Sequence, residues 1–136
     1  MSNRSKAREQ VVQILYLMEQ SKLDIEAALD FFQKNFESYD REMPFIRSRI
    51  QGVTEKLEIL DKHIEKTSNH WKLGRIPKID KNILRLGIFE ILYCEDIPKS
   101  VVMDEAIELA KKFGEEKSSK FINGILDKIA NQPDSL

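Results

Sequence analysis

The amino-acid sequence predicts an all-α protein. Of its 136 residues, 41% are hydrophobic and 33% are charged, proportions typical of a globular chain with a charged helical surface. Five glycines and four prolines leave little material for the many turns that a β fold needs. Apolar residues also recur every three or four positions along most of the chain, and this spacing places them on one face of a helix.

The N-terminal part is expected to form two helices. The first should run from about Lys6 to Gln20, and Arg8, Val12 and Tyr16 follow one another along the flank of its apolar stripe. The second should follow Asp24, whose carboxylate can accept a hydrogen bond from a backbone N–H of the first turn. The residues expected in the core are Ala7, Val11, Ile14, Leu15 and Met18 in the first helix and Ile25, Ala28, Leu29, Phe32 and Phe36 in the second.

A third, long helix is expected to begin at Pro44, because proline suits the first turn of a helix. Its apolar residues alternate steps of three and four, as in a heptad pattern: Met43, Ile46, Ile50, Val53, Leu57, Leu60 and Ile64. Such a pattern fits a coiled-coil dimer or packing inside a bundle. The amphipathic helices on either side favour the bundle.

The periodicity stops from Thr67 to Lys78, where Gly74 and Pro77 indicate a connector. Neither flanking part looks large enough to fold alone, so the chain is predicted to form a single domain with three helices before the connector and three after it. The predicted organisation of residues 1–136 is an N-terminal helical half of about 1–66, a connector of 67–79 and a C-terminal helical half of 80–132.

The helix after the connector, which Asp80 can cap, is expected to be buried on most sides. Ten of the twelve residues from Ile83 to Cys94 are apolar when glycine is counted, and a helix that is apolar all round packs against several neighbours. Arg85 and Glu90 interrupt this run and need polar partners if they are buried.

The stretch from Val101 to Ala130 predicts a helix–turn–helix hairpin. Gly114 follows the first apolar stripe, where a helix commonly ends in a left-handed residue that glycine adopts readily. Ser118 or Ser119 can cap the next helix, and Gly124 inside it is interpreted as a point of close helix contact. The two stripes consist of Val102, Ala106, Leu109, Ala110 and Phe113, and of Ile122, Ile125, Leu126 and Ile129.

No catalytic, metal or cofactor site is expected. His63 and His70 are seven residues apart rather than the four of a helical metal pair, so both are interpreted as surface histidines. The lone Cys94 is interpreted as a small core residue, and it excludes an internal disulfide framework. With no signal peptide in the first ten residues and no apolar run near the ~18 residues of a membrane span, we expect a cytoplasmic protein that is not an enzyme.

Two short segments carry chemistry suited to single-stranded RNA, which is bound by cations along its backbone and by flat side chains against its bases. Residues 1–8 hold three cations and no acid, although such a cluster can also be a solvated tail. The start of the last helix offers Lys117, Lys120 and Phe121, and this phenylalanine can be either buried or half exposed. The net charge of −1 argues against RNA binding over the whole surface.

Several motifs together resemble the NusB family of bacterial transcription antitermination factors. The similarity spans nearly the whole chain in the expected order. It rests on Ala7-Arg8, Gln13–Tyr16, Asp80–Leu86 (DKNILRL), Asp104–Lys111 (DEAIELAK), Phe113-Gly114, Ser118, Lys120–Gly124 (KFING) and Leu126-Asp127.

This resemblance implies two small three-helix subdomains packed across each other, and a role in binding boxA, a short single-stranded RNA element of ribosomal RNA leaders. With Lys117 added, the residues nominated for RNA binding are Arg4, Lys6, Arg8, Tyr16, Lys117, Lys120 and Phe121. The family's partner, the small-subunit ribosomal protein NusE, would contact the region of Asp80, Lys81 and Arg85, and the pair would act in the RNA polymerase antitermination complex.

Two positions depart from the family pattern. Ser5 interrupts a run that is often richer in arginine, so the affinity of the lone protein for RNA is expected to be low. Asp104 replaces an asparagine, which is tolerable because both residues cap helices. The alternative hypothesis is a protein-only helical adapter or a self-associating bundle such as a homodimer, in which the basic arm is only a tail.

Overall fold

The computed structural model describes residues 3–35, 40–68 and 72–132, and within these ranges the chain forms seven α-helices, two short 3-10 helices and no strand. The all-α prediction is confirmed. No described helix has the length and apolar character needed to cross a membrane. The expectations for Phe36 and His70 concern residues outside the described ranges.

The chain divides into two compact units, an N-terminal unit of Met1–Glu55 and a C-terminal unit of Lys56–Leu136. The N-terminal unit holds α1 (Asn3–Ser21), α2 (Ile25–Asn35), the 3-10 helix η1 (Asp40–Glu42) and α3 (Met43–Glu55). The C-terminal unit holds α4 (Leu57–Thr67), the 3-10 helix η2 (Leu73–Arg75), α5 (Lys78–Tyr93), α6 (Lys99–Phe113) and α7 (Ser118–Asn131).

The long third helix of the sequence analysis is two helices, so the expected count of three helices before the connector was wrong, whereas the three expected after it are confirmed. The helix is interrupted at Lys56, whose φ of −102° and ψ of 11° depart from helical values. The apolar stripe is interrupted at the same place: Leu57, expected in the stripe, is 37% exposed, whereas Leu60 and Ile64 are fully buried. The described division therefore places α4 with the C-terminal unit, although the sequence analysis assigned it to the N-terminal half. The single-domain assignment stays a prediction.

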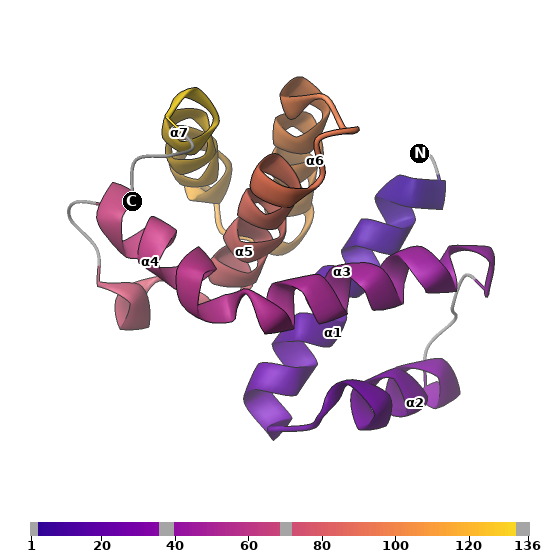
Figure 1. Ribbon diagram of the computed structural model, residues 1–136. Coiled ribbons are helices and arrows are strands. Elements are labelled where there is room, and N and C mark those ends of the chain that lie inside the picture. The colour runs from indigo at the N-terminus through magenta and orange to yellow at the C-terminus, as the bar shows by residue number, and fades with distance from the viewer. Residues whose placement is uncertain (1–2, 36–39, 69–71, 133–136) are drawn as a thin grey trace. The chain divides into compact units, whose positions relative to one another are not determined.

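In the N-terminal unit, α1 contacts both α2 and α3 (Figure 1). Its predicted core residues are buried except Met18, which is half buried, and Val12 is buried as well. Asp24 caps α2 as predicted, since its Oδ1 accepts a hydrogen bond of 2.8 Å from the backbone N–H of Ala27. Arg47 of α3 donates to both carboxylate oxygens of Glu26 on α2, at 2.6 and 2.9 Å.

In the C-terminal unit, α5 contacts α4, α6 and α7 and is buried along most of its length, which confirms the prediction of a central buried helix (Figure 1). The closest approach to α7 occurs at Gly87, where an added Cβ would lie 3.0 Å from Cδ1 of Leu126. The prediction that Gly124 marks close helix contact was wrong, because this residue is exposed and a Cβ there would meet no atom within 4 Å. Gly124 is two positions from both Ile122 and Leu126, which places it on the side of the helix opposite the apolar stripe.

Gly114 ends α6, but not in the left-handed conformation that the sequence suggested. Its φ of −91° and ψ of −175° are those of an extended residue. Glycine is needed there for space, since a Cβ would lie 2.6 Å from Cβ of Ser118 and 2.8 Å from the carbonyl oxygen of Ala110. The absence of a side chain lets the start of α7 fold back closely against the end of α6.

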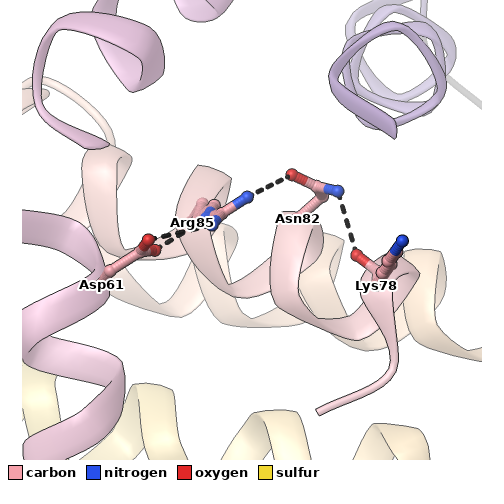
Figure 2. Close-up of polar contacts among 4 residues, drawn as sticks. All are labelled: Asp61, Lys78, Asn82 and Arg85. Carbon is pink, nitrogen blue, oxygen red and sulfur yellow. Dashed lines mark hydrogen bonds and ion pairs between the residues drawn. The ribbon is translucent and has the colours of Figure 1, made fainter. Parts of the chain in front are cut away.

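A polar network joins α4 to α5 (Figure 2). The guanidinium of Arg85 donates to both carboxylate oxygens of Asp61, from Nε at 2.8 Å and from Nη2 at 2.9 Å. Its Nη1 donates to Oδ1 of Asn82 at 3.2 Å, and Asn82 in turn donates to the carbonyl oxygen of Lys78 at 3.0 Å. The polar partner that the sequence analysis required for a buried Arg85 is thus an acid 24 residues earlier in the chain.

Candidate nucleic-acid interface

The residues predicted to bind RNA fall into two groups, one in each unit. Arg4, Lys6, Arg8 and Tyr16 all lie on α1, and Lys117, Lys120 and Phe121 lie at the start of α7.

The N-terminal group is organised by the ring of Phe45, which lies in the first turn of α3 and is 9% exposed. The guanidinium carbon of Arg4 lies 4.2 Å from the centroid of this ring, and its Nε donates to Oε2 of Glu42 at 2.9 Å. The side chain of Arg4 is nevertheless 52% exposed. A guanidinium that stacks on an aromatic ring keeps its N–H edge available for a phosphate or carboxylate.

Arg8 lies one turn further along α1, and its guanidinium carbon lies 5.4 Å from the same ring. It is only 3% exposed, so the structure encloses a cation that the sequence analysis placed at the surface. At this degree of burial, the guanidinium of Arg8 is better placed to hold the ring of Phe45 in position than to contact RNA directly.

Sequence reasoning missed a third cation, Arg49, which approaches the ring of Phe45 at 4.4 Å from α3. The spacing of four residues between Phe45 and Arg49 is visible in the sequence and places both on one helical face. The proximity to Arg4 is not visible, because it depends on how α3 packs against α1.

The two remaining predicted residues of α1 differ in accessibility. Tyr16 is 39% exposed, so its ring is available to stack against a base. Val12, which precedes it on the same flank, is fully buried. Lys6 is half buried.

The C-terminal group lines a pocket of about 680 Å³. The lining residues are Pro77, Asp80, Glu115, Lys117, Ser118, Lys120 and Phe121. Both lysines are exposed, and Phe121 is half buried, with part of its ring accessible from the pocket. The structure therefore brings two cations and one flat apolar side chain to a single concave surface.

A buried carboxyl forms part of this pocket. The hydroxyl of Ser118 donates to Oδ2 of Asp80 at 2.9 Å and accepts a hydrogen bond of the same length from the backbone N–H of Glu115. Oδ1 of Asp80 is buried without a hydrogen-bond partner. Burial raises the pKa of Asp80 above its ordinary value, the bond from Ser118 lowers it, and the charge of Glu115 raises it. A buried oxygen without a partner disfavours the charged carboxylate, in agreement with the raised pKa.

Asp80, Lys81 and Arg85 were predicted to contact a protein partner. Asp80 is 3% exposed and belongs to the pocket, where it lies among the residues predicted for RNA. Arg85 is 7% exposed and is paired with Asp61 (Figure 2). Lys81 is half buried. Two of the three side chains are thus bound within the C-terminal unit, and their role at a partner interface stays a prediction.

His63 is buried, with 4% exposure, so the expectation of a surface histidine was wrong at this position. Burial, followed by the charge of Lys66, lowers the pKa of His63 below its ordinary value. The described part of the chain contains no group of three histidine, cysteine or acidic residues that could bind a metal ion.

Comparisons with known proteins agree with the motifs. A sequence model of the NusB family matches residues 5–131. The chain is 44% identical over 131 residues to the transcription antitermination protein NusB of Anaeromyxobacter dehalogenans, which covers 96% of this chain and 92% of that protein. Its structure is similar to T. maritima NusB, with a TM-score of 0.86 and 36% identity over 97% of this chain and 93% of that one. It is also similar to a chain in the crystal structure of the antitermination factors NusB and NusE in complex with dsRNA, with a TM-score of 0.81 and 25% identity over 94% of this chain and 96% of that one.

Proposed function

Because this chain belongs to the NusB family of transcription antitermination proteins, we propose that it binds boxA-type single-stranded RNA of ribosomal RNA operons together with the ribosomal protein NusE. The family resemblance, the NusB fold and the role in transcription antitermination are confirmed by the comparisons. The chain is accordingly an antitermination factor and not an enzyme.

The observation that carries the RNA proposal is the pocket at the start of α7. Its exposed Lys117 and Lys120 supply charge for the phosphate backbone, and the accessible part of the Phe121 ring offers a surface on which an unstacked base can lie. A double helix keeps its bases stacked, so this combination favours a single strand.

The N-terminal group supplies a second set of contacts. Arg4 and Tyr16 are the accessible members of the predicted arm, one a cation for phosphate and the other a flat side chain for a base. Together the two groups provide the mixture of backbone charge and aromatic surface that binding of single-stranded RNA requires.

NusE is proposed as the protein partner because a chain 25% identical to this one forms part of a complex of NusB and NusE with RNA. Within the C-terminal unit, Lys81 is the most accessible of the three residues predicted for this contact. The pair would act in the RNA polymerase antitermination complex, and we therefore place the protein in the cytoplasm.

The proposal can be tested by fluorescence anisotropy with a labelled boxA-type single strand, a scrambled strand and the boxA duplex, each with and without NusE, at several salt concentrations. We expect the boxA single strand to bind most tightly, binding to strengthen with NusE, and affinity to fall with salt because counterions are released from the phosphates. Equal, weak binding of all three RNAs without an effect of NusE would overturn the proposal and favour the protein-only adapter.

A matched pair of variants assigns the RNA contact to the pocket. Lys120→Gln should lower the affinity and make the slope of log K against log salt shallower by about 0.7, the value for one phosphate contact on a single strand. Lys128→Gln removes an exposed lysine from the other end of α7 and should leave both quantities unchanged. The same loss in both variants would mean that overall charge, rather than the pocket, attracts the RNA.

A further inference from the structure

The ring of Phe45 has three guanidinium groups around it, those of Arg4 at 4.2 Å, Arg49 at 4.4 Å and Arg8 at 5.4 Å from its centroid. We call Phe45 and these three arginines the arginine cluster. It joins α1, which carries Arg4 and Arg8, to α3, which carries Phe45 and Arg49.

Like charges repel, so three cations do not gather on one side chain unless something holds them there. The electron-rich face of the ring offsets part of this repulsion, and the carboxylate of Glu42 pairs with Arg4 at 2.9 Å.

The members of the cluster differ in how accessible they are. Arg4 has a side chain that is 52% exposed, Arg49 is half buried, and Arg8 is 3% exposed. The guanidinium carbons of Arg4 and Arg49 lie 4.2 and 4.4 Å from the same ring centroid, so Phe45 holds both groups within reach of one short stretch of phosphate backbone. Stacking fixes the plane of each group and directs its N–H donors along the edge, the geometry in which arginine binds phosphate oxygens in pairs.

From this geometry we propose that Arg49 is an RNA phosphate-binding residue that acts beside Arg4, and that Phe45 is the positioning residue that holds both guanidiniums. The inference rests on the proposed RNA-binding function and adds to it a cation from α3. Arg8, which is 3% exposed and 5.4 Å from the ring centroid, supports the cluster without touching the phosphate.

The chain offers a matched control for Arg49. Arg47 lies two positions earlier on the same helix, where residues point in different directions, and it is bound to Glu26 on α2. Arg49→Gln and Arg47→Gln therefore remove the same charge from the same helix, the first inside the arginine cluster and the second outside it.

The test is fluorescence anisotropy of the full chain with a labelled boxA-type single strand across a salt series. Arg49→Gln should lower the affinity and reduce the salt slope by about 0.7, the value for one phosphate contact on a single strand, whereas Arg47→Gln should match the wild type. Phe45→Leu keeps every charge, so it should lower the affinity while leaving the salt slope near the wild-type value. Circular dichroism of each variant shows whether the helices remain intact, and Arg49→Gln decides the question if Phe45→Leu unfolds.

The inference would be overturned if Arg49→Gln bound the RNA as tightly as Arg47→Gln and with the same salt slope. Salt-dependent binding of boxA by the wild type would still support the proposed function in that case. Wild-type protein that shows no salt-dependent binding to this RNA would overturn the proposed function itself. An Arg49→Lys variant that recovers the slope but not the full affinity would support a stacked, paired contact rather than a point charge.

Discussion

Arginine serves two different purposes in the two units of this protein. In the N-terminal unit, Arg4 stacks on Phe45 with about half of its side chain in solvent, and its pairing with Glu42 is at the surface. In the C-terminal unit, Arg85 is buried and forms a bidentate ion pair with the carboxylate of Asp61 (Figure 2). The first arrangement leaves a cation available to a ligand, and the second uses a cation to join two helices. The residue type is the same in both places. The burial of the side chain and the geometry of its partners distinguish an arginine that can bind a ligand from one that joins two helices.

Removing the carboxylate of Asp61 should produce the largest effect on stability. Asp61→Ala leaves the guanidinium of Arg85 largely buried without its ion partner, and breaking a buried pair from one side destabilises a fold by about 3 kcal/mol or more. Urea unfolding monitored by circular dichroism measures the change. The double variant Asp61→Leu/Arg85→Met should recover much of the loss, because it removes both charges. A double variant no more stable than Asp61→Ala would show that packing, rather than charge, dominates at this site.

A side chain at Gly114 should have the next largest effect. In Gly114→Ala the new Cβ would lie 2.6 Å from Cβ of Ser118, so the start of α7 must shift, and overpacking of this kind destabilises by about 1–3 kcal/mol. The hydrogen bond from Ser118 to Asp80 should be lost as well. Gly124→Ala is the control: it meets open space on the exposed face of α7 and should stabilise the protein by up to about 1 kcal/mol. Equal changes in melting temperature for Gly114→Ala and Gly124→Ala would contradict the close packing of Gly114 against Ser118.

The carboxyl of Asp80 should give the C-terminal unit a characteristic dependence on pH. Its pKa is raised on folding, so the folded protein holds this proton at pH values where the unfolded chain has lost it. The stability that this bound proton contributes is fully present below pH 3.8, the ordinary pKa of the carboxyl, and is lost as the pH rises through the raised pKa of the folded state.

Asp80→Asn should remove this dependence, so that the variant gains in stability relative to the wild type as the pH rises above 3.8. Melting temperatures over a pH series test the expectation, with Asp127→Asn on the exposed face of α7 as control. A gap between Asp80→Asn and the wild type that stays constant with pH would show that Asp80 does not titrate in this way.

The smallest effect on stability is expected for Arg4, and it completes the contrast with Arg85. Because the side chain of Arg4 is about half exposed, Arg4→Gln should change the free energy of unfolding by less than about 1 kcal/mol. Its affinity for boxA RNA should nevertheless fall, with a shallower salt slope. If Arg4→Gln lowered the free energy of unfolding as much as Asp61→Ala, Arg4 would also be a structural residue, and the contrast with Arg85 would be wrong.

Features set by local sequence were predictable. The cap at Asp24, the stripe of α7 and the burial of α5 all follow from neighbouring residues in the sequence, and the structure confirms each of them. The start of α7 was also correctly identified as bringing Lys117, Lys120 and Phe121 to one place.

Features that depend on packing between distant segments were not predictable. Packing between helices that meet only in the folded chain accounts for the close approach at Gly87 and for the contact of both Arg4 and Arg49 with one ring. The helix break at Lys56 was likewise not visible in the apolar spacing. The position of the buried Arg8 has the same origin, because its guanidinium carbon lies 5.4 Å from the ring of Phe45 on another helix.

The break at Lys56 bears on how the protein is made. Each unit is encoded by one uninterrupted stretch of the chain, so the N-terminal unit is complete in sequence before the first residue of α4 is synthesised. Synthesis proceeds from the N-terminus, and folding during translation generally begins with the segment that leaves the ribosome first. Phe45 and its three arginines, all encoded before residue 50, can therefore assemble while α5, the centre of the other unit, is still being translated.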